Sequence, residues 1–69
     1  MNEVGIRIKL LRKQLNITQK SFSQRILVTP SYLSRVENGS EKPTEKLLKL
    51  ITLEFSVSNN WLLNGIEPM

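Results

Sequence analysis

Apolar side chains recur along most of the chain with the spacing of an α-helix. Val4, Ile8, Leu11 and Leu15 follow one another at intervals of four, three and four residues, which places them on one side of a helix. The basic and amide side chains between them lie largely away from that side. This pattern predicts a first amphipathic helix that ends near Asn16.

Hydroxyl residues mark the starts of the later helices, because a threonine or serine oxygen can accept a hydrogen bond from a free amide of the first turn. Thr18 precedes a predicted helix at 19–26, and Thr29 precedes one at 30–38 that opens on Pro30 and closes at the Asn38-Gly39 pair. Thr44 precedes a fourth helix, which ends at the break over 56–58. A short last helix begins at Ser58 or Asn59 and ends at Gly65.

These segments predict an all-α fold, a compact bundle of about five short helices. No repeat, low-complexity run or linker divides the 69 residues, so we expect a single domain over 1–69. A chain of this size buries only about 60% of its unfolded surface, and a simple arrangement rich in local contacts suits it.

The composition argues against enzymatic chemistry. The chain contains no cysteine and no histidine, so it lacks disulfides, thiolate metal ligands and the commonest general base. The six carboxylates form no evident catalytic pair. We therefore expect no enzyme activity, no metal and no cofactor, and no small-molecule ligand is evident.

The opening stretch, MNEVGIRIKLLRKQ, never places more than two apolar residues together. It thus contains neither a signal-peptide core nor a membrane span. This predicts a soluble, cytoplasmic protein with no membrane partner.

The positive charge is concentrated in the first half of the chain. Residues 1–35 hold seven Lys and Arg against one Glu, or +6, and residues 36–69 hold three Lys against five Glu, or −2, which sum to the net +4. A basic half favours a polyanionic partner such as nucleic acid. A merely solvated basic face is the alternative.

The two short helices around 27–28 form a predicted helix-turn-helix over about 18–38. At 100° per residue the third helix turns Thr29, Leu33 and Val36 to one side. The opposite side carries short polar residues and one arginine: Ser31, Ser34, Arg35 and Asn38. Tyr32 and Pro30 lie at the flanks of this side. Such a face suits the major groove of DNA, where an arginine donates to guanine and a tyrosine packs on a thymine methyl or donates to a phosphate. An exposed helix of low charge is the alternative.

The run TQKSFSQRILVTPSYLSRVENG resembles the helix-turn-helix of phage repressors and Cro proteins, also called xenobiotic-response-element-type regulators. IRIKLLRKQLNITQ is similar to the family's first helix, and VENG to the end of its recognition helix. LLKLITLEFSVSNNWLLNG is similar to its closing helices. The resemblance implies a lambda-repressor-like DNA-binding domain.

The resemblance also implies residue roles. The matched base-reading stretch is Thr29 to Arg35, with Ser31, Tyr32 and Arg35 outward and Ser34 as a further base contact. Positions expected at DNA phosphates are Gln19, Lys20, Thr29, Asn38, Ser40 and Lys42, although Lys20, like Arg25, is equally explained as a solubilising charge. Arg12 and Glu37 match a structural salt bridge, the alternative being that Arg12 faces the groove.

Three positions depart from the family pattern. Leu27 stands where the turn normally has glycine, so either it takes a positive φ or the turn differs. Ser23 replaces a common alanine, and Ser56 replaces a common helix-ending glycine.

Trp61 is interpreted as a core aromatic, with a ligand or partner site as the alternative.

The expected function is a sequence-specific transcriptional regulator of double-stranded DNA, a repressor that binds a palindromic operator as a homodimer. The dimerisation segment is predicted at about 58–69, with Leu62, Leu63 and Ile66 as its interface. The alternative is an antitoxin-type or other protein-interaction module in which DNA binding is secondary.

Overall fold

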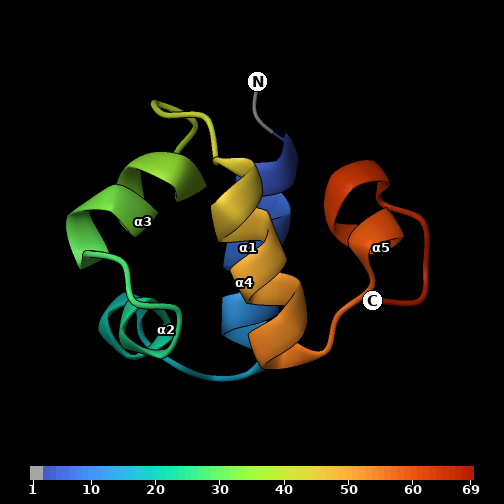
Figure 1. Ribbon diagram of the computed structural model, residues 1–69, viewed down its shortest axis with the longest axis horizontal. Helices are drawn as coiled ribbons and strands as arrows, with labels where there is room; N and C mark the ends of the chain where they lie inside the picture. Colours follow the sequence, from blue (N-terminus) through green and yellow to red (C-terminus); the bar gives the residue numbers. More distant parts are fainter. Residues whose placement is uncertain (1–2) are drawn as a thin grey trace.

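The computed structural model describes residues 3–69, which fold into five α-helices (Figure 1). They are α1 (Glu3–Gln14), α2 (Gln19–Arg25), α3 (Pro30–Glu37), α4 (Glu45–Phe55) and α5 (Asn59–Asn64). Helices α2 and α3 pack on each other, α1 contacts both α3 and α5, and α4 contacts α5. The all-α prediction is confirmed over this part of the chain.

Four helices begin on the hydroxyl residues expected from the sequence. The side chains of Thr18, Thr29, Thr44 and Ser58 each accept a hydrogen bond from the amide three residues later. Each cap satisfies one of the amides that have no partner within the first turn of a helix. These local contacts fix where the helices start.

Several helices end on a residue with positive φ. Asn16 (φ 59°) follows α1, and two hydrogen bonds close the turn: the Asn16 amide donates to the Lys13 carbonyl at 3.0 Å and the Ile17 amide to the Arg12 carbonyl at 3.3 Å. The predicted end of the first helix near Asn16 is therefore late by two residues, because α1 ends at Gln14. Gly39 and Gly65 end α3 and α5 in the same left-handed region.

One hydrophobic core joins all five helices. Its side chains are almost fully shielded from solvent: Ile8, Leu11, Phe22, Ile26, Leu33, Val36, Leu47, Ile51, Trp61 and Leu62. Phe22 also stacks on Phe55 with ring centroids 4.5 Å apart, which joins α2 to α4. The core interpretation of Trp61 is confirmed, whereas Leu15 lies exposed just after α1 instead of continuing the apolar side.

Helices α1 and α3 approach each other closely at Gly5. A Cβ atom added at Gly5 would overlap the carbonyl oxygen of Val36, so only glycine fits this crossing. The contact brings the backbone of α1 directly against the backbone of α3 at Val36.

Within residues 3–69, no helix combines the length and apolar character required to cross a membrane.

Candidate nucleic-acid interface

Helix α3 begins with a cap that leaves its first turn at the surface. The hydroxyl of Thr29 accepts a hydrogen bond from the Tyr32 amide at 3.1 Å, and Pro30 occupies the first helical position. Thr29, Pro30 and Ser31 are all exposed. Free amides and the positive end of the helix dipole at such a terminus favour an anionic group.

The side of α3 opposite Leu33 and Val36 carries Ser31 and Arg35 at the surface. Ser34 is half-buried beside them. These side chains are short or flexible, and Arg35 supplies the only charge that the helix exposes. The structure thus exposes Ser31 and Arg35, two of the four residues that the sequence predicts as base-reading, and leaves Ser34 partly exposed on the same side.

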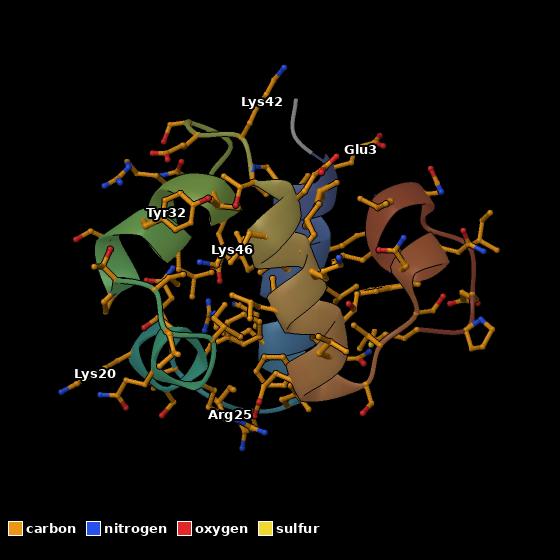
Figure 2. All side chains as sticks on the ribbon, in the orientation of Figure 1. Glu3, Lys20, Arg25, Tyr32, Lys42 and Lys46 are labelled. Carbon is orange, nitrogen blue, oxygen red and sulfur yellow. The ribbon has the colours of Figure 1, made fainter. Side chains whose placement is uncertain are left out.

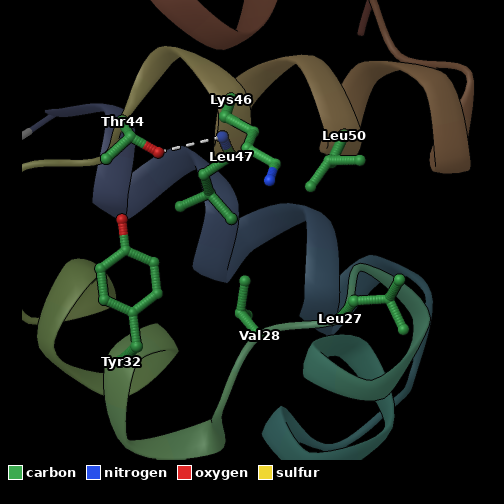
Figure 3. Close-up of a pocket in the computed structure, with 7 residues that line it drawn as sticks. All are labelled: Leu27, Val28, Tyr32, Thr44, Lys46, Leu47 and Leu50. Carbon is green, nitrogen blue, oxygen red and sulfur yellow. Dashed lines mark hydrogen bonds between the residues drawn. The ribbon is translucent and has the colours of Figure 1, made fainter.

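Tyr32 is the fourth, and it does not face outward. Its side chain points toward the start of α4, as Figure 3 shows, and borders a cavity of about 350 Å³ together with Val28, Thr44 and Leu47. The hydroxyl is buried and has no hydrogen-bond partner among the described residues. The predicted outward position of Tyr32 is wrong, because its ring packs between α3 and α4 instead of lying on the free face.

Asn38 to Lys42 form a tight turn after α3. The side-chain oxygen of Asn38 accepts from the Ser40 amide at 3.0 Å and from the Ser40 hydroxyl at 2.6 Å. Gly39 supplies the positive φ of 86° that reverses the chain. Lys42 projects freely from this turn (Figure 2). The side-chain oxygen of Asn38 and the hydroxyl of Ser40 are therefore engaged with each other, while Lys42 is available to a phosphate.

Lys20 extends from α2 into solvent, away from the body of the molecule (Figure 2). Arg25, at the other end of α2, instead pairs with Glu54 at 3.0 Å and lies over the Phe55 ring at 4.7 Å. The two basic residues of α2 therefore differ: Arg25 has an ion-pair partner, whereas Lys20 has none among residues 3–69.

Gln19 opens α2 and turns its side chain inward. Its amide nitrogen donates to Oε1 of Glu37 at 3.1 Å, and the residue is half-buried. The side chain that the resemblance assigns to a phosphate thus holds an internal carboxylate, and a phosphate contact would need its remaining polar atoms.

Arg12 and Glu37 lie together, as the resemblance implies. Nε and Nη2 of Arg12 donate to the two carboxylate oxygens of Glu37 at 2.9 and 3.1 Å, while Nη1 donates to the Ile17 carbonyl at 3.1 Å. The Glu37 side chain is only 3% exposed. Arg12 therefore joins α1 to α3 and does not face a groove.

The turn between α2 and α3 keeps the usual geometry despite its leucine. Leu27 takes a φ of 60°, and the Val28 amide donates to the Ser23 carbonyl at 3.0 Å, which closes a left-handed helix end. The first of the two alternatives for Leu27 is confirmed. The side chain is 88% exposed, so it gains little packing in return for this conformation.

The structure buries one of the three residues predicted at a dimer interface and leaves the other two exposed. Leu62 is fully buried in the core of its own chain, so its assignment to an interface is wrong: it packs inward as part of α5. Leu63 and Ile66 remain 39% and 57% exposed. Only these two can contact a partner from the predicted set.

Two residues of this region escaped the sequence analysis. Nη1 of Arg7 donates to the carbonyls of Leu62 and Leu63 at 3.1 Å, which joins α1 to the end of α5. Glu41 accepts from Nε of Arg35 at 2.7 Å. No sequence signal marks the Arg7 contact, since 55 residues separate the partners, but the Asn38-Gly39 turn is a signal that positions 35 and 41 lie near each other.

Within residues 3–69, no group of three or more acidic, histidine or cysteine side chains could hold a metal ion. The region is instead a helix face flanked by exposed lysines.

Comparisons with known proteins agree with this geometry. A family model described as a helix-turn-helix domain matches residues 5–68. The chain is 36% identical over 70 residues to "Antitoxin PezA" of Streptococcus pneumoniae serotype 4, covering 93% of this chain and 44% of that protein. It is 33% identical over 64 residues to "HTH-type transcriptional regulator DicA" of Escherichia coli K12, covering 93% and 47%.

A third relative is "HTH-type transcriptional activator BcrR" of Enterococcus faecalis, 32% identical over 65 residues, with 94% of this chain and 32% of that protein covered. The chain thus spans less than half the length of each of these relatives. No solved structure matches the chain significantly. The match over 5–68 and the α2–turn–α3 geometry lead to one conclusion: the chain belongs to the helix-turn-helix domain family, of the phage repressor and Cro type that its sequence resembles.

Proposed function

We propose that the chain binds double-stranded DNA sequence-specifically as a transcriptional regulator, with α3 in the major groove. The observation that carries the proposal is the exposed face of α3, where Ser31 and Arg35 stand at the surface of a helix in a helix-turn-helix. Short side chains allow the helix backbone to approach the base edges, and an arginine can donate two hydrogen bonds to O6 and N7 of a guanine.

Phosphate contacts flank this face in the proposal. Lys20 and Lys42 are exposed and extend from α2 and from the turn after α3. The exposed start of α3 at Thr29 adds amides that suit an anion. Asn38 and Ser40 contribute through the turn that they hold together, and Gln19 through the amide atoms that Glu37 does not use.

A salt series tests the proposal. The strongest duplex selected by the protein from a randomised pool should bind steeply less well as salt rises, because each neutralised phosphate releases counterions. Lys20→Ala and Lys42→Ala should weaken binding to all duplexes alike and should each lower the slope of log K against log salt by about one. Lys49→Ala, at an exposed position of α4, is the charge-matched control. A pool from which no duplex is enriched at low salt would refute DNA binding.

We further propose that the protein acts as a homodimer on a palindromic operator. Two units related by a two-fold axis would read half-sites about one helical turn, roughly 34 Å, apart. Exposed Leu63 and Ile66 support an interface at the end of the chain described here. Ile66→Lys should shift sedimentation toward the monomer, whereas Leu53→Lys, at a 75% exposed leucine of α4, should not.

We propose that the protein represses transcription, by analogy with the phage repressor type. A reporter promoter overlapped by the selected duplex should lose expression when the protein is supplied. One relative is named as an activator. Increased expression from the same reporter would therefore indicate activation instead of repression and would leave the DNA-binding proposal intact.

An antitoxin-type protein-interaction module is the second candidate, and the 36% identity to a protein named as an antitoxin favours it. In that case the selected duplex would bind weakly, and a protein partner would bind more tightly than DNA. Affinity for the duplex in the micromolar range or weaker at moderate salt, close to non-specific levels, would support this candidate.

A further inference from the structure

Arg35 and Glu41 are joined at both the side-chain and the backbone level. Nε of Arg35 donates to Oε1 of Glu41 at 2.7 Å. The amides of Ser40 and Glu41 also donate to the Arg35 carbonyl, at 3.0 and 3.2 Å. The ion pair and the backbone hydrogen bonds therefore connect residues 35 and 41 twice, across the turn that follows α3.

The turn after α3 is itself well connected. Gly39 takes a φ of 86°, and the Asn38 side chain accepts two hydrogen bonds from Ser40. These contacts set the direction in which the chain leaves α3. The backbone of this turn thus holds Glu41 next to Arg35, whereas many surface ion pairs depend on two flexible side chains alone.

The pairing uses only one edge of the guanidinium group. An arginine carries one donor hydrogen on Nε and four on Nη1 and Nη2. With Nε held by Glu41, neither Nη atom of Arg35 donates a hydrogen bond to any residue within 3–69. The terminal fork of two nitrogens is left free, and such a fork matches the two acceptors O6 and N7 of guanine.

We propose that Glu41 is a positioning residue that determines specificity: by holding Nε, it makes Arg35 present its terminal fork to a guanine. The proposal rests on the proposed function, since it assigns a role within the same DNA interface. Glu41 touches no base in this arrangement. It instead restricts the rotamers of Arg35 and excludes the approach in which Nε and one Nη would contact the base.

Two other roles of Glu41 make different predictions. If its carboxylate only repelled phosphates, removing it would strengthen binding to every duplex alike. If it only kept Arg35 away from DNA, removing it would strengthen binding to the selected duplex and raise the preference for guanine. A positioning role predicts the reverse, a loss of that preference.

The test uses the full chain and the duplex that it selects from a randomised pool. The guanine read by Arg35 is the position whose replacement by adenine or by 7-deazaguanine, which lacks N7, weakens binding of the wild type but not of Arg35→Ala. Affinities for the guanine and substituted duplexes are then compared in Glu41→Ala, Glu41→Gln and Glu54→Ala. Glu54→Ala is the matched control, because Glu54 also pairs with an arginine at 3.0 Å and its side chain is 40% exposed, against 41% for Glu41.

We expect the wild type to prefer guanine about 5- to 150-fold at this position, the range of one good bidentate contact. Glu41→Ala should lose most of this preference, whereas Glu54→Ala should keep it. Glu41→Gln should retain the preference within about threefold, because its amide oxygen can still accept from Nε. All variants should melt within a few degrees of the wild type, since Glu41 lies outside the core.

A guanine preference in Glu41→Ala within twofold of the wild type would overturn the proposal. Equal losses in Glu41→Ala and Glu41→Gln would also overturn it, because the charge and not the hydrogen bond would then be responsible. A selected duplex with no guanine that depends on Arg35 would overturn it as well while leaving the proposed function intact. Absence of any selected duplex would instead refute the proposed function itself.

Discussion

Arg12 donates hydrogen bonds to both carboxylate oxygens of Glu37, at 2.9 and 3.1 Å, and so joins α1 to the last turn of α3. Gln19 adds a third hydrogen bond to the same carboxylate at 3.1 Å. The carboxylate at the end of α3 is thereby satisfied from within the protein. The three side chains connect the first three helices through one buried group.

Glu37→Gln should cost about 3–5 kcal/mol in the free energy of unfolding, because the substitution leaves the guanidinium of Arg12 buried without a counter-charge. Urea unfolding followed by the fluorescence of Trp61, the single tryptophan, measures this change. Glu3→Gln is the control: Glu3 is exposed and lies 3.6 Å from Arg7, so its loss should cost at most about 0.5 kcal/mol. A loss below about 1 kcal/mol for Glu37→Gln would contradict the expectation.

Tyr32→Phe should raise the free energy of unfolding by about 1 kcal/mol. The hydroxyl is buried without a hydrogen-bond partner among residues 3–69, and removing it relieves an uncompensated desolvation cost while the ring keeps its packing. DNA affinity should stay unchanged, because this hydroxyl does not lie on the free face of α3. Parallel urea and DNA-binding titrations check both points. A specific loss of DNA affinity would restore the base-reading role predicted from the sequence.

Leu27→Gly should stabilise the protein by about 1 kcal/mol, since glycine adopts the positive φ of 60° without the steric cost that leucine bears. The leucine is 88% exposed, so little buried apolar surface is lost. Leu53→Gly, at an exposed leucine inside α4, should instead destabilise by about 1 kcal/mol. Opposite signs for the same chemical change, measured as shifts of the urea midpoint, are the expected result.

Gly5→Ala should destabilise the protein by about 3 kcal/mol. The new methyl group would overlap the carbonyl oxygen of Val36, and this is backbone that cannot move aside without separating α1 from α3. Lys9→Ala, at an exposed position of α1, is the control and should change stability by less than about 0.5 kcal/mol. Thermal unfolding of both variants measures the difference, and equal melting temperatures would exclude a tight crossing.

The parts of the fold that depend on neighbouring residues could be predicted from the sequence. Thr18, Thr29, Thr44 and Ser58 cap helices because the amide that each one binds lies only three residues ahead. The left-handed conformation at Gly39 follows from the same local rules. The order and approximate bounds of the five helices therefore needed no knowledge of distant contacts.

Side-chain directions set by distant helices could not be predicted in this way. The helical projection leaves Tyr32 at the flank of α3, and it is the position of α4 that draws the ring inward. Leu62 looked available for a partner because the sequence does not reveal that α5 turns this residue toward the core. The resemblance placed Arg12 and Glu37 together, but it gave no sign that Gln19 completes the group.

Arg7 has a consequence for how two copies of this protein would be arranged. Its two hydrogen bonds to the carbonyls at the end of α5 join that helix to α1, and α1 in turn contacts α3 through Gly5. In a dimer joined through Leu63 and Ile66, a rigid path would thus run from the interface of one subunit to its reading helix. The separation of the two reading helices would then be fixed by the protein, and DNA with half-sites at another spacing would have to bend or twist to be bound.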